Sequence, residues 1–302
     1  MTDRPPAPAI FFLSDYGTAD EYVGLVHAVL HREAPGVPVI DLSHQIPPFD
    51  VAAGAALLER SAPFVGAGVV LAVVDPGVGT SRRAVAVAVR STGAGPAWLV
   101  GPDNGLLMPM AATYGGPTAV IDLTPGGRPA PAGGDGPGPT FDGRDLFAPA
   151  AAHLVRGGDP ATLGPAVDPG SLVAGPEPPE HPVGGGGGPV PAGPGGPEVR
   201  TAVASVDRFG NVQLGVGAAA MEPLDDPAGG AARVTVVTRA GEHTVPVRRV
   251  RAFGELEPGQ LGLLVDSTAR LAVVLDRASA AAHLGVDVGA EVVIRGAGPD
   301  DG

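Results

Sequence analysis

Three acidic residues directly follow apolar runs that have the character of buried strands. Asp15 follows the run AIFFLS, Asp75 follows VVLAVV, and Asp103 follows AWLVGP. Ligands of open α/β sheets bind outside the carboxyl ends of the strands, so we expect these carboxylates near one crevice. There, a carboxylate accepts hydrogen bonds from hydroxyl groups or pairs with a cation. The alternative is ordinary helix capping or turn formation, which aspartate also favours.

The segment that starts at Asp75 has the composition of a loop that approaches a ligand. It has the sequence DPGVGTSRR, in which Pro76 fixes its own φ angle and the glycines permit close approach of the backbone. Arg82 or Arg83 could fold back to pair with Asp75. The plainer interpretation is a simple connection between two strands.

Two further segments combine charged side chains with turn residues. TFDGRD, centred on Asp142, precedes a predicted helix and could also be a helix N-terminus with an exposed ion pair. DRFGN, from Asp207 to Asn211, could be a hairpin turn. The Asn211 amide can both donate and accept, which matches the paired groups on an adenine edge.

The residue types present exclude several kinds of catalysis. The chain has no cysteine and its 19 basic residues are all arginine, so thiol catalysis and lysine Schiff bases are excluded. It has no G-x-S-x-G segment of serine hydrolases and no H-E-x-x-H pair. His27 and His31 are four residues apart but have no acidic partner near them in the sequence. We therefore predict no metal and no cofactor.

Alternating strand and helix patterns would position these residues in the first part of the chain. A helix is expected after Thr18–Glu21, which fits a capping box. Such alternation predicts an α/β domain over residues 1–172, with a mixed, largely parallel sheet and flanking helices. The predicted strands are Ala9–Ser14, Val37–Leu42, Val69–Val74, Arg83–Arg90, Ala97–Val100 and Ala119–Leu123, and the other helices are Val51–Arg60, Gly105–Tyr114 and Gly143–Arg156.

The second part of the chain has a different character. Residues 173–198 are rich in glycine and proline and predict an interdomain linker, and a shorter insert of this kind spans Gly126–Pro139. From residue 199 to 302, short β-like runs separated by glycine and proline predict a small all-β barrel domain. These runs are Thr201–Val206, Val234–Thr238, His243–Val250, Gly262–Val265, Leu271–Leu275 and Glu291–Arg295.

Charge and hydropathy restrict the partners and the location. The net charge of −13 argues against general binding to nucleic acid or to anionic membranes. The apolar run Ala9–Leu13 is too short for the core of a signal peptide or for a membrane span. A soluble cytoplasmic protein is therefore expected.

Seven segments form an ordered set that covers both predicted domains. Together they resemble the S-adenosyl-L-methionine hydrolase (hydroxide adenosyltransferase) family, which is related to the fluorinating and chlorinating enzymes. The segments are SDYGTADEYVGLVHAVL (14–30), DLSHQIPPFDVAAGAALL (41–58), VVDPGVGTSRR (73–83), GPDNGLL (101–107), TFDGRDLFAPAAAHL (140–154), SVDRFGNV (205–212) and the block near Asp266 and Ser267.

The resemblance implies a fold, an assembly and a reaction. The implied fold is an N-terminal α/β domain followed by a C-terminal β-barrel. The implied assembly is a homotrimer, with S-adenosylmethionine bound where the N-terminal domain of one subunit meets the C-terminal domain of a neighbour. The implied reaction converts S-adenosylmethionine and water to adenosine and L-methionine, with S-adenosylmethionine as substrate and no cofactor.

The resemblance also implies roles for residues that bind the substrate. Asp15 matches the carboxylate that binds the ribose hydroxyls, and Phe49 matches an aromatic position that lines the nucleoside pocket. Asn211 matches an amide that reads adenine, and Ser267 matches another contact on the adenine side. Asp207 matches a contact to the methionine ammonium group, a sensible ionic pairing.

The catalytic segment departs from the family pattern at one position. Asp75 and Arg82 match two members of a catalytic Asp–Arg–His triad, whereas Asp142 stands at the histidine of the usual T-F-H-G-R-D segment. The leaving group is a neutral thioether, so no general acid is needed and the main demand is in-line placement of water at the 5′ carbon. We therefore expect Asp75, Arg82 and Asp142 to orient a water or hydroxide.

Two alternative functions remain open on the same residues. Halide-using relatives carry a tyrosine at the position of Asp75, and the fluorinating ones carry a long insert where Ser91–Pro96 is short, so both features favour water over halide. Because Asp142 replaces the histidine, the second alternative is a non-catalytic protein that binds S-adenosylmethionine or adenosine. Binding without turnover would identify this second alternative.

Overall fold

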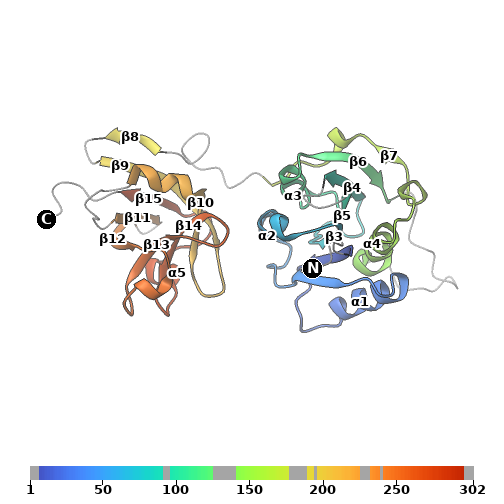
Figure 1. Ribbon diagram of the computed structural model, residues 1–302, viewed down its shortest axis with the longest axis horizontal. Coiled ribbons are helices and arrows are strands. Elements are labelled where there is room, and N and C mark those ends of the chain that lie inside the picture. The colour runs from blue at the N-terminus through green and yellow to red at the C-terminus, as the bar shows by residue number, and fades with distance from the viewer. Residues whose placement is uncertain are drawn as a thin grey trace, which may run out of the picture. The chain divides into compact units, whose positions relative to one another are not determined.

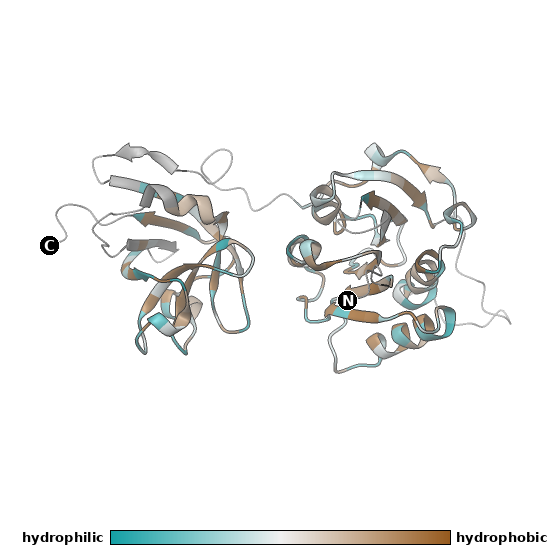
Figure 2. Cartoon of the chain, viewed as in Figure 1, coloured by the Kyte–Doolittle hydropathy of each residue, from teal (hydrophilic) through white to brown (hydrophobic). Residues whose placement is uncertain are grey.

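The computed structural model describes residues 7–90, 96–124, 141–176, 189–193, 196–224, 232–238 and 241–295. The chain divides into two compact units, Met1–Pro176 and Glu177–Gly302 (Figure 1). The predicted insert Gly126–Pro139 lies outside the described residues, as does much of the predicted linker. The apolar residues of the described strands gather inside each unit (Figure 2).

The first unit contains a mixed seven-stranded sheet with the order β2-β1-β3-β5-β4-β6-β7. Its first four strands are parallel neighbours, and β4, β6 and β7 pair in antiparallel fashion. The strands β1 and β3 are buried along their whole length, which explains their unbroken apolar sequences. The strands are β1 (Ala9–Ser14), β2 (Val39–Ser43), β3 (Gly68–Val73), β4 (Ala84–Arg90), β5 (Pro96–Pro102), β6 (Pro117–Asp122) and β7 (Ala166–Val167).

Helices cover both faces of this sheet, so the predicted α/β domain is confirmed (Figure 1). Successive residues of β1 point to opposite faces: Phe11 packs in the cluster that includes α2 and α3, and Phe12 in the cluster that includes α1 and α4. The helices are α1 (Tyr22–Glu33), α2 (Val51–Ser61), α3 (Met108–Thr113) and α4 (Ala148–Val155).

Two local predictions differ from the structure. The predicted capping box at Thr18–Glu21 is wrong: Glu21 is the N-cap of α1 without a side-chain hydrogen bond, and Thr18 Oγ1 accepts from Gln45 Nε2 at 3.2 Å instead. The predicted helix Gly143–Arg156 begins as one π-helical turn, η2 (Gly143–Phe147), before α4 continues. A π-helical turn often marks a functional position.

The second unit is a closed β-barrel, as predicted. Its strands follow the order β10-β14-β13-β12-β11-β15-β9, and the pairing of β9 with β10 closes the ring. The strand β8 (Pro189–Gly193) pairs with the start of β9 and is not part of the ring of seven strands. Both β8 and the first residues of β9 fall inside the range 173–198, which was predicted to be a linker. The barrel strands are β9 (Gly196–Val206), β10 (Val212–Gly217), β11 (Ala232–Thr238), β12 (Gly241–Arg249), β13 (Leu261–Val265), β14 (Arg270–Leu275) and β15 (Glu291–Arg295), and a short helix α5 (Ala280–Leu284) follows β14.

Within the described part of the chain, no helix combines the length and the apolar character needed to cross a membrane.

Two glycine-to-alanine substitutions should have opposite effects on stability. In β5, a Cβ at Gly101 would lie 2.2 Å from the Ala72 carbonyl oxygen, so Gly101→Ala should destabilise by about 1–3 kcal/mol. In α1, a Cβ at Gly24 meets no atom within 4 Å, so Gly24→Ala should stabilise by roughly 0.5–1 kcal/mol. Urea unfolding of the two variants tests this, and shifts of the same sign would contradict it.

Candidate active site

Arg82 lies between two buried carboxylates in the first unit. Its Nε donates to Asp75 Oδ1 at 3.1 Å, and its Nη2 donates to both Asp75 Oδ2 and Asp142 Oδ2, the latter at 2.9 Å. The side chains of Asp75, Arg82 and Asp142 are only 6%, 9% and 8% exposed. We call these three residues the Arg82 cluster. The structure thus brings all three predicted catalytic residues together.

Three separate elements supply this cluster. Asp75 lies just beyond β3, Arg82 lies just before β4, and Asp142 is the N-cap of the π-helical turn η2. The loop between Asp75 and Arg82 is closed by local bonds, because Gly77 N donates to Asp75 Oδ1 at 3.2 Å and Thr80 Oγ1 donates to Gly77 O at 2.7 Å. The Arg82 guanidinium also lies 5.5 Å from the centroid of the Phe147 ring. The arginine is therefore fixed from several sides.

The surroundings of the Arg82 cluster raise the basicity of the Asp75 carboxylate. Burial raises the pKa of Asp75, the Arg82 charge and hydrogen bonds oppose this rise, and the negative charge of Asp15 adds to it. With all groups ionised, two carboxylates face one guanidinium, and the cluster carries one net negative charge. A carboxylate with a raised pKa is a stronger proton acceptor than an exposed one.

Tyr16 also belongs to this region, although it is not among the site residues predicted from the sequence. Burial, and then the charges of Asp15 and Asp75, raise the pKa of the Tyr16 phenol, so the hydroxyl stays protonated at neutral pH. A Cβ at Gly143 would lie 2.2 Å from Tyr16 Oη, so the missing side chain beside Asp142 makes room for the phenol. The one indication in the sequence is the position of Tyr16 directly after Asp15.

Asp15 and Phe49 are also brought together, as predicted for two residues of one nucleoside site. Asp15 lies just beyond β1, and its Oδ2 accepts a hydrogen bond from Phe49 N at 2.9 Å. Phe49 has a φ angle of 69°, which is rare for a residue with a side chain, and its ring is 70% exposed. The loop before α2 therefore holds Phe49 with its ring exposed and its backbone hydrogen-bonded to the Asp15 carboxylate.

Asp103 serves a different purpose from the other two acidic residues. Its Oδ2 accepts from Arg83 Nε at 2.9 Å, and its Oδ1 accepts from Val173 N at 2.8 Å. Arg83 also donates to the Ser171 hydroxyl at 3.0 Å. Asp103 thus ties the last described residues of the first unit to the sheet, while Asp15 and Asp75 remain electrostatically coupled.

The predicted residues of the second unit begin with the turn between β9 and β10. Asp207 Oδ1 accepts from Phe209 N at 2.8 Å and from Asn211 N at 3.0 Å, and Asp207 Oδ2 accepts from Asn211 Nδ2 at 2.8 Å. Gly210 within this turn has a φ angle of 82°. Because a carboxylate only accepts, the Asn211 amide must turn its nitrogen toward Asp207. Its oxygen therefore faces away from Asp207.

Ser267 lies away from that turn within the same barrel. It is exposed, in the turn between β13 and β14. In the β10–β14 pairing, Val212 lies opposite Val273 and Gly217 lies opposite Arg270. Asn211 directly precedes Val212 at the start of β10, whereas Ser267 lies in the turn before Arg270, which pairs with the end of β10. The two residues therefore lie toward opposite ends of the paired strands.

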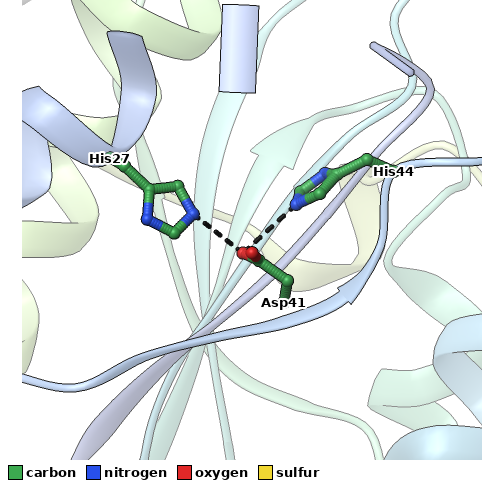
Figure 3. Close-up of side chains that lie close together, drawn as sticks. All are labelled: His27, Asp41 and His44. Carbon is green, nitrogen blue, oxygen red and sulfur yellow. Dashed lines mark hydrogen bonds and ion pairs between the residues drawn. The ribbon is translucent and has the colours of Figure 1, made fainter. Parts of the chain in front are cut away.

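A second polar cluster of the first unit has the composition of a metal site. His27 from α1, Asp41 from β2 and His44 from the segment after β2 have ligand atoms within 4.8 Å of one another (Figure 3). No metal site was predicted from the sequence, because Asp41 is 14 residues from His27 and only the fold brings them into contact. No predicted site residue is a member of this cluster.

Comparison with known proteins places both units in one family. Residues 10–164 match the family described as SAM hydroxide adenosyltransferase N-terminal domain, and residues 201–293 match the corresponding C-terminal domain. A protein of Salinispora tropica named (R)-S-adenosyl-L-methionine hydrolase is 44% identical over 94% of this chain and 96% of its own length. A protein of Thermus thermophilus with the same name is 41% identical over 94% of this chain and 98% of its own length. A solved structure of an uncharacterized conserved protein from Thermotoga maritima superposes with a TM-score of 0.75, at 31% identity, over 94% of this chain and 99% of that one.

Removal of the central guanidinium should destabilise the first unit strongly at neutral pH. Arg82→Met leaves two buried carboxylates without their cation, which should cost about 3–5 kcal/mol. Arg82 lowers the pKa of Asp75, so without it the folded-state pKa lies further above the unfolded value. Proton binding then favours the folded state, and this contribution is lost as the pH rises through the folded pKa. The deficit should therefore shrink in acid, as urea unfolding between pH 5 and pH 8 can measure.

The matched control is Arg32→Met, which removes an exposed partner of Glu33. The two side chains of that pair are 70% and 45% exposed, so the loss should be below about 1 kcal/mol at every pH. A pH-independent deficit in Arg82→Met would contradict the assignment.

Proposed function

The chain belongs to the SAM hydroxide adenosyltransferase family, and we propose that it hydrolyses S-adenosyl-L-methionine to adenosine and L-methionine. The observation that carries this proposal is the buried Arg82 cluster, which lies in the electrostatic field of Asp15. The first unit thus couples two carboxylates electrostatically: Asp15, which suits the ribose hydroxyls, and Asp75, which suits proton transfer from water.

The nucleoside part of the substrate is assigned to Asp15 and Phe49. Asp15 Oδ2 already accepts from Phe49 N, which fixes the carboxylate, and the remaining lone pairs suit the two ribose hydroxyls. The exposed Phe49 ring provides an apolar surface for the nucleoside. Neither group needs a cofactor for this task, and the proposed reaction uses none.

In the second unit, the geometry leads us to assign Asp207 and Asn211 to one end of the substrate. Their side chains are hydrogen-bonded at 2.8 Å, whereas adenine and the methionine ammonium group lie at opposite ends of S-adenosylmethionine. We propose that Asn211 reads adenine through its oxygen and its second N–H, and that Asp207 is a positioning residue that fixes the amide. Ser267, toward the other end of β10 and β14, is proposed to contact a different part of the substrate.

The chemical step needs a placed nucleophile rather than an acid. A water oxygen forms a bond to the 5′ carbon while the bond from that carbon to sulfur breaks, and the electron pair of the broken bond stays on the neutral thioether. The water loses one proton, and the negative Arg82 cluster is the proposed acceptor. Tyr16, which stays protonated, is a hydrogen-bond donor available to orient the water.

The reaction itself is tested with purified protein, S-adenosylmethionine and ¹⁸O-labelled water. We expect adenosine and methionine in equal amounts, with the label on the adenosine 5′ oxygen, and no halogenated nucleoside when chloride is added. Mass spectrometry measures all three. Calorimetric binding without product would favour the non-catalytic alternative, and a chlorinated product would favour the halide-using one.

The role of Asp142 is tested by a substitution that keeps its shape and removes its charge. Asp142→Asn should lower kcat by about tenfold or more, because a neutral amide is a poor proton acceptor and the Arg82 cluster loses its net negative charge. KM should change much less, since no substrate contact is assigned to Asp142. Steady-state kinetics measure both constants.

Asp145→Asn is the matched control in the same segment. Asp145 pairs with Arg144, and both side chains are 27% exposed outside the Arg82 cluster. Its kcat should stay within about twofold of the wild-type value, since this partly exposed ion pair lies outside the Arg82 cluster. Full activity of Asp142→Asn would remove that residue from the mechanism.

The assembly and the location remain part of the same proposal. We propose a homotrimer in the cytoplasm, with each site built from the first unit of one copy and the second unit of a neighbour. The support is that the proposed binding residues are divided between the two units and that the chain lacks cysteine. Light scattering coupled to size exclusion measures the mass of the assembly.

A further inference from the structure

His27, Asp41 and His44 converge on one point at the edge of the first sheet. His27 Nε2 lies 2.9 Å from Asp41 Oδ1, and His44 Nε2 lies 3.1 Å from the same oxygen. Figure 3 shows both imidazole rings turned toward the Asp41 carboxylate. We call these residues the His27 cluster. No member of it belongs to the Arg82 cluster or is among the residues assigned to the substrate.

The His44 ring carries the observation that points to a ligand. Its side chain is only 5% exposed, yet its Nε2 has no hydrogen-bond partner. Asp41 Oδ1 is near enough but lies off the direction in which a ring N–H donates. A buried ring nitrogen without a partner is costly, unless another atom binds it.

We propose that the His27 cluster binds a divalent transition-metal ion of the zinc class. Two imidazole nitrogens and one carboxylate oxygen are ligands that zinc and its neighbours accept. Metal–ligand bonds of about 2.0–2.1 Å in tetrahedral geometry separate two ligand atoms by about 3.3 Å. The two separations from Asp41 Oδ1, 2.9 Å and 3.1 Å, are close to this value. The ligand atoms of all three residues lie within 4.8 Å of one another.

The surroundings of the His27 cluster have the features of a supported metal site. His44 Nδ1 lies 2.8 Å from the buried Ser14 hydroxyl, so Ser14 can accept its N–H and leave the Nε2 lone pair for the metal. The Phe12 ring forms an apolar wall, with its centroid 4.5 Å from that of His44 and 6.0 Å from that of His27. His27 and Asp41 are 35% and 43% exposed, which leaves an entry path and room for water ligands.

The position of the cluster defines what the ion would join. His27 comes from α1, Asp41 from the edge strand β2, and Ser14 is the last residue of β1. Metal binding would therefore connect a covering helix to the sheet edge. It would also hold the strand end that continues into Asp15.

The test uses the full chain without a histidine tag, stripped with a chelator and then freed of it. Titration calorimetry with zinc chloride should give one ion per chain, and cobalt(II) should give visible absorption bands. His27→Gln and Asp41→Asn should each weaken zinc binding by at least about tenfold. Zinc should raise the unfolding temperature of the wild type and not that of His27→Gln.

His31→Gln is the matched control, because His31 is an exposed histidine one helical turn further along α1. It should bind zinc with wild-type affinity. Circular dichroism of each variant without metal verifies that the fold is kept. The proposal is overturned if zinc fails to bind at about 1 mM, or if His27→Gln and His31→Gln bind it equally well.

Discussion

The first unit depends on one guanidinium that satisfies two buried carboxylates. Without Arg82, Asp75 and Asp142 would lose the cation that they share at very low exposure, and burying a charge without an opposite charge is costly. The loop that begins at Asp75 and the π-helical turn that begins after Asp142 therefore meet at this side chain. Its planar fork suits this task, because Nε and Nη2 can bind both oxygens of one carboxylate while Nη2 also reaches the second.

The same cluster explains how an aspartate can stand where relatives are expected to carry histidine. A histidine beside Arg82 would contribute no negative charge when neutral, whereas Asp142 adds one. A negative charge at this position opposes ionisation of the Asp75 carboxylate. Burial raises the pKa of Asp75 in the same direction. Proton acceptance then belongs to the group of residues more than to one side chain, as in other coupled carboxylates.

The sequence predicted those features that depend on local patterns, and missed those created by contacts between distant segments. Unbroken apolar runs located β1 and β3, and the family resemblance selected Asp75, Arg82 and Asp142, which lie together in the structure. Tyr16 was missed because its role comes from burial against Gly143, and the His27 cluster because Asp41 joins it through the fold. The capping box failed because Thr18 bonds to Gln45 instead.

The closure of the barrel has a consequence for the order in which the second unit can form. β9 pairs with β10 on one side and with β15 on the other, so the first strand of the ring is completed by the last. The turn that carries Asp207 and Asn211 follows β9 directly. During synthesis on the ribosome, β9 therefore lacks this neighbour until β15 has emerged. The turn that carries Asp207 and Asn211 gains its final support only at that late point, since non-local strand pairing must wait for both partners.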